Sequence, residues 1–153
     1  MRVQFLVYTT PAPQGSMKAH VVRGKAYLSC DNRKTMPFRH AVTQVARRTL
    51  ADMNLNEPVA GKHIPVRLSL EFHIARPQSI PKKRLTPSVK PDIDKLCRAT
   101  LDSLTGVLFA DDGQVTEIIA RKVYATGPER VWIAMEPLSL SSDVVADVMK
   151  LEF

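Results

Sequence analysis

The residues from Val66 to Ile74 constrain the fold most, because apolar and polar side chains alternate along them without a break. Successive side chains of a strand point to opposite faces of a sheet, so this segment is predicted to be a strand with one buried face. A similar alternation, rich in Val, Phe and Tyr, predicts a strand over residues 2–10. Because a sheet with one buried face needs a second layer, we expect helices to cover it.

Two further stretches carry apolar residues at helical spacing. Residues 35–53 are predicted to form a helix that Thr35 caps and that tolerates Pro37 in its first turn. Residues 92–105 are predicted to form a second helix, with Asp92 at its start and Gly106 as its stop signal. The apolar stripes of the two helices are Phe38, Val42, Val45, Ala46, Thr49, Leu50 and Met53, and Ile93, Leu96, Cys97, Leu101 and Leu104.

Shorter elements complete the predicted fold. A hairpin is expected around Arg23–Gly24–Lys25, and residues 115–124 and 131–136 are expected to form an antiparallel pair. The fold class is therefore predicted to be α/β (α+β), as one compact domain over residues 1–137. In this domain two main helices back a mixed β-sheet in the order β-α-β-α-β-β, and a tail over residues 138–153, expected to be helical, follows it.

Charge is distributed unevenly along the chain. The protein has 22 Lys and Arg against 15 Asp and Glu, but residues 1–90 hold 16 of these basic residues and only 4 acidic ones. Residues 76–91 combine five basic residues and four prolines with no acid, which predicts an irregular basic loop. Such a surface is typical of proteins that bind a polyanion, most often nucleic acid, although solubility alone is the open alternative.

Several classes of protein are excluded by absent features. No apolar run approaches the roughly 20 residues of a membrane span, so no membrane partner is expected. Cys30 and Cys97 cannot form a disulfide framework or a cysteine-based zinc site, which makes a reducing cytosol the expected compartment. The chain has no P-loop motif, so no nucleotide cofactor is expected.

Carboxylates occur in two tight groups, Asp92 with Asp94 and Asp111 with Asp112. Hard oxygen ligands without a matching Cys or His cluster suit Mg²⁺ or Mn²⁺. Arg98 lies four residues after Asp94, so these side chains share a helix face. Structural alternatives stay open for each group: Asp92 as a helix cap, Asp94–Arg98 as a surface ion pair, and Asp111–Asp112–Gly113 as a simple turn.

The order and spacing of three motifs add a family resemblance. The motifs are KPDIDKLCR from Lys90 to Arg98, LDSLTG from Leu101 to Gly106, and DDGQV from Asp111 to Val115. Together they resemble the signature of RusA-type Holliday-junction resolvases, which are crossover junction endodeoxyribonucleases. The segments Pro13–Ser16 with Lys18 and Lys34–Arg39 are similar to the N-terminal part of phage and prophage members.

This resemblance implies a homodimeric endonuclease of DNA recombination and repair that depends on Mg²⁺, with Mn²⁺ as the alternative ion. Such an enzyme resolves four-way DNA junctions by paired symmetric nicks. The resemblance assigns Asp92, Asp94, Asp112 and Arg98 to catalysis and Asp92, Asp94 and Asp112 to the metal, with Asp111 as a further ligand. Two departures stand out, because Lys95 replaces an Asn of many members and Arg98 replaces a Lys.

Contacts to the DNA backbone are expected from basic side chains outside this signature. The candidates are Lys18, Arg39, Lys82, Lys83, Arg84, Lys95 and Lys122. A bacterial cytosol, or that of a phage-infected host, is the expected location. Two other functions remain open: a non-catalytic protein that binds junctions or duplex DNA, and another Mg²⁺-dependent nuclease that acts on branched DNA or RNA.

Overall fold

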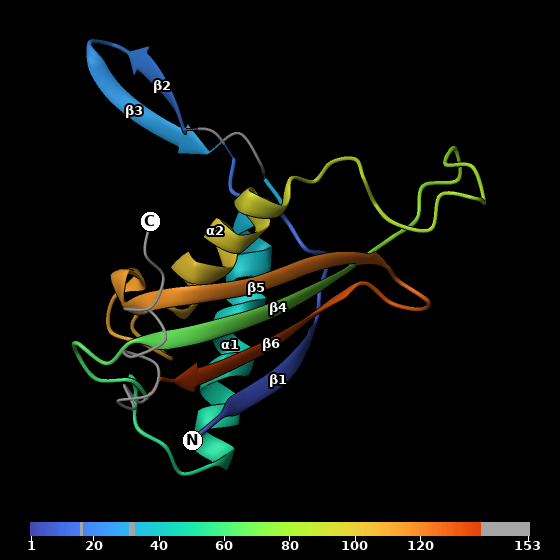
Figure 1. Cartoon of the computed structure of the whole chain (residues 1–153). Coiled ribbons are helices and arrows are strands. Elements are labelled where there is room, and N and C mark those ends of the chain that lie inside the picture. Colours follow the sequence, from blue (N-terminus) through green and yellow to red (C-terminus); the bar gives the residue numbers. More distant parts are fainter. Residues whose placement is uncertain (16, 31–32, 139–153) are drawn as a thin grey trace, which may run out of the picture.

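In the computed structural model, which describes residues 1–15, 17–30 and 33–138, two helices cover one face of a four-stranded mixed sheet (Figure 1). The predicted α+β fold is thereby confirmed; the tail beyond Leu138 and its predicted helix lie outside the described residues. The sheet contains β1 (Val3–Tyr8), β4 (Val66–Ile74), β5 (Val115–Tyr124) and β6 (Arg130–Pro137). The helices are α1 (Thr35–Asp52) and α2 (Ile93–Leu104), and η1 (Asp112–Gln114) is a short 3-10 turn. The predicted hairpin consists of β2 (Met17–Val22) and β3 (Lys25–Cys30) and stands apart from the sheet.

The strand order is β1-β6-β4-β5, with β4 parallel to β5 and antiparallel to β6. The predicted pairing of residues 115–124 with residues 131–136 is therefore wrong, because β4 lies between these two strands. The chain turns through residues 125–129 and passes over the end of β4 before β6 begins. This arrangement lets β4, the strand with the strictest alternation, pair along both of its edges.

The core lies between the sheet and the two helices. Every second residue of β4 is buried there, as the alternation predicted, and α2 contributes Leu96, Ala99 and Leu104. The apolar segment Val107–Phe109, which follows α2, is buried too. Burial of these side chains fixes α2 on the sheet, and α2 carries the candidate site at its start.

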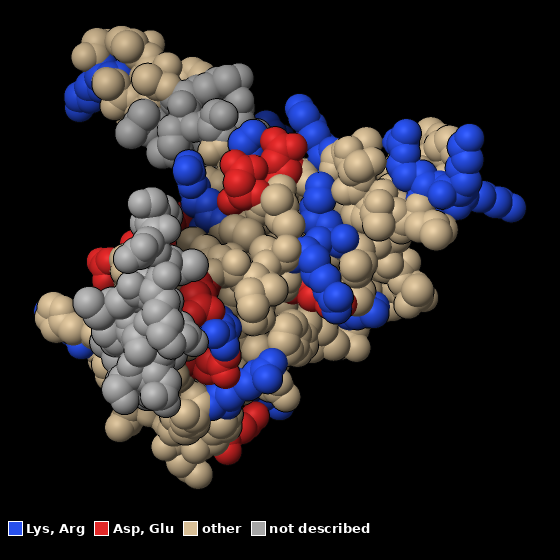
Figure 2. Space-filling view, viewed as in Figure 1, with Lys and Arg blue, Asp and Glu red and all other residues tan. Residues whose placement is uncertain are grey.

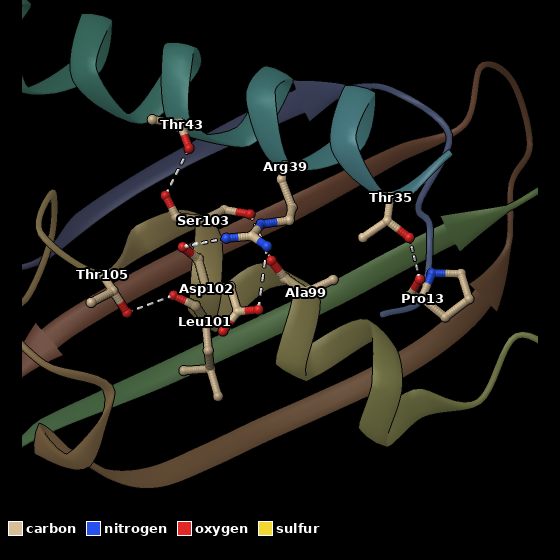
Figure 3. Close-up of polar contacts among 9 residues, drawn as sticks. All are labelled: Pro13, Thr35, Arg39, Thr43, Ala99, Leu101, Asp102, Ser103 and Thr105. Carbon is tan, nitrogen blue, oxygen red and sulfur yellow. Dashed lines mark hydrogen bonds and ion pairs between the residues drawn. The ribbon is translucent and has the colours of Figure 1, made fainter. Parts of the chain in front are cut away.

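Thr35 does not cap α1, which corrects the sequence prediction. It is the first residue of the helix, with Lys34 at the cap position. The Thr35 hydroxyl instead donates to the carbonyl oxygen of Pro13 over 2.8 Å (Figure 3). This hydrogen bond ties the start of α1 to the segment that leads into the hairpin, so a residue with capping chemistry serves a tertiary contact.

Polar side chains cross the contact between α1 and α2 (Figure 3). Arg39 forms an ion pair with Asp102 at 3.5 Å, and Thr43 donates to the carbonyl oxygen of Ser103 over 2.8 Å. Each is partly buried, and each links residues about 60 positions apart in the chain. They fix the position of α2 along α1.

The parallel pairing of β4 with β5 decides where the candidate residues lie. Parallel neighbours need a crossover that returns the chain from the end of one strand to the start of the next. Here residues 75–114 form that crossover, and α2 runs back along the sheet within it. The basic loop and the start of α2 therefore lie at one end of the sheet, and Asp111 and Asp112 at the other.

Neither helix of the described chain combines the length and the hydropathy that a membrane-spanning helix requires.

We expect Leu96→Ala to lower the free energy of unfolding by about 2–5 kcal/mol, because it empties a site that is 0% exposed in the core. Leu85→Ala is the matched control, since Leu85 is 78% exposed, and it should change stability by less than about 0.5 kcal/mol. Urea unfolding followed by circular dichroism measures both. Equal effects of the two variants would contradict the packing of α2 described above.

Candidate functional site

Asp92 stands at the start of α2, with extended backbone angles, but its side chain accepts no capping hydrogen bond. Its carboxylate instead accepts from the Lys95 ammonium over 2.9 Å. This hydrogen bond and charge hold the pKa of Asp92 below its ordinary value, and Lys90 and Lys122 add to the effect. Asp92 is thus ionised. Because its carboxylate does not cap the backbone of its own helix, it can contact a ligand outside the chain.

Asp94 and Arg98 follow on the next turns of α2, and both are exposed. Within the described part of the chain neither forms an ion pair, so the suggested Asp94–Arg98 surface pair is not seen. Asp102, one turn further along, pairs with Arg39 of α1. Consequently a carboxylate and a guanidinium at the start of α2 are free to contact a ligand, whereas the last acidic residue on this face is engaged in packing.

Lys122 of β5 connects the sheet to the start of α2. Its ammonium donates to the carbonyl oxygens of Val89 and Pro91 over 2.9 and 2.8 Å. These residues immediately precede Asp92, so Lys122 fixes the backbone from which that carboxylate projects. The structure therefore gives Lys122 a positioning contact, while its predicted contact with DNA stays a prediction.

The basic loop of residues 76–91 is irregular, as its prolines predicted, and projects from the domain (Figure 1). Arg76 organises the base of the loop. It donates to the carbonyl oxygens of Pro81 and Arg84 and lies 4.9 Å from the centroid of the Tyr124 ring. Lys82, Lys83 and Arg84 are exposed, and Figure 2 shows basic side chains at the outer end of this loop.

Asp111 and Asp112 differ in what holds them. Asp111 completes a capping box around η1: its carboxylate accepts from the Gly113 amide over 2.8 Å, and its amide donates to the Gln114 side chain. A Cβ at position 113 would lie 2.9 Å from that carboxylate, so a larger residue there would have to displace the Asp111 side chain. Asp112 is exposed and has no side-chain partner among the described residues. The turn interpretation therefore holds for Asp111, and Asp112 remains free.

These carboxylates do not gather in one place. Within residues 1–15, 17–30 and 33–138, no three His, Cys, Asp or Glu side chains lie close enough together to hold one metal ion. Asp92 and Asp94 do share one helix start, and Figure 2 shows acidic side chains there between the two projecting segments. Mg²⁺ on phosphate substrates is held by one or two carboxylates, with water and phosphate as its other ligands. The Asp92–Asp94 pair fits that donor set, and Asp112 lies at the far end of α2.

The remaining predicted DNA contacts have different environments. Lys95 is exposed but paired with Asp92, and Arg39 is half-buried against Asp102. Lys18 lies in β2 opposite Ser29. Their contacts with DNA stay predictions.

Gln14 lies in the segment Pro13–Ser16, whose sequence predicted a family likeness but no contact. Its backbone amide donates to the Lys95 carbonyl oxygen over 2.9 Å, and its buried side-chain oxygen has no hydrogen-bond partner among the described residues. It lines an open cavity of about 430 Å³ together with Lys90, Asp92 and Lys95. No periodicity marks this residue, and the contact spans some 80 positions, so spacing along the chain could not reveal it.

We expect Lys122→Met to loosen the start of α2, because two backbone carbonyls lose a charged donor. The free energy of local opening should fall by about 1–3 kcal/mol, so amides of residues 89–96 should exchange roughly 5- to 150-fold faster. Hydrogen exchange followed by mass spectrometry measures this. Lys62→Met, at an exposed lysine elsewhere in the domain, is the control and should leave these amides unchanged. Unchanged exchange in Lys122→Met would contradict the positioning contact.

Comparison with known proteins gives the same family as the motifs. The chain is similar to YqaN of Bacillus subtilis (strain 168), described only as an uncharacterized protein, with 26% identity over 140 residues. That match covers 90% of this chain and 97% of YqaN. The family model for endodeoxyribonuclease RusA matches residues 9–136, a range that contains the start of α2, the basic loop, the hairpin and the Asp111–Asp112 turn. The chain therefore belongs to the RusA endodeoxyribonuclease family.

Proposed function

We propose that this protein is a Mg²⁺-dependent endonuclease that resolves four-way DNA junctions by paired nicks and acts as a homodimer. Family membership supports the activity. The observation that carries the proposal for this chain is the start of α2, where Asp92 and Asp94 project outward beside Lys95 and Arg98. Carboxylates that neither cap the helix nor form its packing contacts are suited to a ligand outside the chain.

Each group at the start of α2 has a proposed task. Asp92 and Asp94 would hold Mg²⁺, which when bound supplies Lewis-acid activation of water and of the scissile phosphate. The positive end of the helix dipole and the Lys95 ammonium attract the phosphate to the same place. Lys122 and the Gln14 amide position this helix start from the sheet and from the N-terminal segment.

Arg98 is proposed to stabilise negative charge on the phosphate. Its guanidinium is exposed, has no ion-pair partner among the described residues, and follows Asp94 by one helical turn. Because arginine keeps its proton, it is unsuited to proton transfer and suited to a bidentate contact with phosphate oxygens. The replacement of the family lysine by arginine is compatible with this task, since both side chains supply a positive charge.

A homodimer is proposed because a four-way junction presents two scissile strands related by approximate two-fold symmetry, which a C₂ dimer matches. The separation of the carboxylates suggests a second role for the dimer, which is to bring carboxylates of two protomers together in one site. Asp112 lies at the far end of α2 from Asp92 and Asp94, so we propose that it completes the site of the partner protomer.

A non-catalytic junction-binding protein is the second candidate function. Two observations favour it: no three metal-binding side chains gather within the described chain, and Asp92 is already paired with Lys95. It predicts tight binding to a four-way junction with no cleavage in Mg²⁺ or Mn²⁺. Cleavage assays with Mg²⁺ and with EDTA separate the two candidates.

Asp94→Asn and Asp112→Asn should each reduce cleavage of a synthetic four-way junction by about a hundredfold or more, the effect of losing one charge-stabilising group. Junction binding should be retained or strengthened, because a carboxylate that repels DNA is gone. Gel assays of cleavage and binding measure both. Asp52→Asn at the end of α1 is the matched control and should cut normally. Normal cutting by either test variant would remove that residue from the site.

Mixing the two inactive variants tests where Asp112 acts. In a shared site, a mixed dimer holds one site with both substitutions and one site with none, so single nicks should return. If each protomer uses its own Asp112, both sites of the mixed dimer lack a carboxylate and no nicks appear. The second result would contradict the proposed shared site without affecting the proposed activity.

The paired substitution Lys82→Ala and Lys83→Ala should weaken binding to junctions of any sequence. Two phosphate contacts fewer should also lower the slope of log affinity against log salt by roughly 2. Titrations at several salt concentrations measure this slope. Arg47→Ala with Arg48→Ala, on the exposed side of α1, is the matched control and should leave the slope unchanged. An unaltered slope in the Lys82 and Lys83 variant would remove the loop from the DNA contacts.

A further inference from the structure

The β2–β3 hairpin is a second segment that projects from the domain (Figure 1). Its two strands pair with each other from Met17 opposite Cys30 to Val22 opposite Lys25, and they form a sheet of their own. Arg23 and Gly24 both have positive φ angles, as the tightest hairpin turns require. No other strand of the described chain joins this two-stranded sheet, and apolar side chains near the turn are exposed.

Those apolar side chains are unusually exposed. Val21, Val22 and Tyr27 are 75%, 55% and 53% exposed. The register places Val22 opposite Lys25 and His20 opposite Tyr27. Val22 and Tyr27 are therefore diagonal neighbours on one face of the ribbon, with Lys25 beside them. One face of the hairpin thus presents an aromatic ring and a branched apolar side chain next to a cation.

The charge of the hairpin indicates what covers this face. Residues 17–30 contain Lys18, Arg23 and Lys25 and no acidic residue. Arg23 and Lys25 are exposed at the turn, and Figure 2 shows basic side chains at the outer end of the hairpin. A partner that matches both the apolar and the basic groups must combine flat apolar surfaces with negative charge. Nucleic acid does so, because its bases stack and its phosphates are anionic.

The position of the hairpin relates it to the candidate site. The segment that leads into β2 is tied to the first turn of α2 by the Gln14 amide and to α1 by the hydroxyl of Thr35. The hairpin and the basic loop project on either side of the start of α2 (Figure 1), and acidic side chains lie between them (Figure 2). DNA that binds at Asp92 and Asp94 would therefore pass between the hairpin and the basic loop.

We propose that the β2–β3 hairpin is a wedge that recognises the branch point of the DNA: Val22 and Tyr27 pack on bases that the branch leaves unstacked, while Arg23 and Lys25 contact the neighbouring phosphates. This inference rests on the proposed function and extends it to the choice of branched over linear DNA. Proteins that distort DNA insert apolar side chains at base steps, and aromatic side chains stack on exposed bases. A linear duplex offers no unstacked base, so the wedge favours the junction.

The test compares a four-way junction carrying 2-aminopurine at the branch with a linear duplex of the same sequence, both in EDTA so that nothing is cut. The variant combines Val22→Ala with Tyr27→Ala. We expect its affinity for the junction to fall by about tenfold or more, the scale of losing one stacked aromatic ring. Its affinity for the duplex should stay within about twofold, and the change in 2-aminopurine fluorescence that the unaltered protein causes should be lost.

Two further variants control the experiment. Tyr27→Phe keeps the ring and should behave like the unaltered protein. Tyr8→Ala removes an exposed tyrosine from β1, outside the hairpin, and should also leave the junction affinity and the fluorescence unchanged. Thermal unfolding checks that all variants fold alike, which their exposed positions predict.

Three results would overturn the wedge. The first is an unchanged junction affinity and fluorescence in the double variant. The second is an equal loss of affinity for junction and duplex. The third is a lower solution mass of the double variant, which would show that the hairpin is a contact between protomers. Failure of the proposed function looks different: the unaltered protein would not cut the junction in Mg²⁺. If it also bound no junction, the wedge would fall with the proposed function; if it bound the junction without cutting it, the wedge would stand. Binding and cleavage of the junction by the unaltered protein therefore separate the two failures.

Discussion

The parallel pairing of β4 with β5 is the constraint on which the rest of the structure depends. It obliges residues 75–114 to return along the sheet, and this crossover contains the basic loop, α2 and the Asp111–Asp112 turn. Burial of the apolar face of α2 fixes that crossover on the sheet. The two ends of α2 consequently present two different sets of charged side chains, which lie at opposite ends of the sheet.

The acidic residues at the two ends of α2 differ in whether nearby groups of the protein already bind their carboxylates. Asp111 is engaged by the turn that it caps, and Asp102 by its pairing with Arg39. Asp92 lies at a position where aspartate commonly caps a helix, yet its carboxylate faces Lys95 and the solvent. A carboxylate that gives up a favourable local hydrogen bond is better placed to contact a ligand. The start of α2 therefore carries carboxylates that are better placed to contact a ligand than Asp111 is.

Patterns of nearest neighbours predicted much of the fold. The alternation along β4 and the apolar stripes of α1 and α2 predicted the elements and the buried face, because burial acts residue by residue at the period of each structure. The strand with which another strand pairs is not determined by such local patterns. The residues of β5 and β6 are compatible with direct pairing, and only competition with β4 excludes it. Thr35 likewise has the chemistry of a cap, but the carbonyl oxygen of Pro13 competes for its hydroxyl.

The sequence by itself determined the types of the elements, the basic loop, the two carboxylate pairs and the family to which their motifs point, because these depend on residue identity and spacing. The tertiary structure decided that Lys122 and the backbone amide of Gln14 hold the start of α2, from which Asp92 projects. It also decided that Asp112 lies apart and that the hairpin stands free of the sheet. These facts depend on contacts between residues distant in the chain, which compete for the same hydrogen-bonding groups, and spacing along the chain does not record that competition.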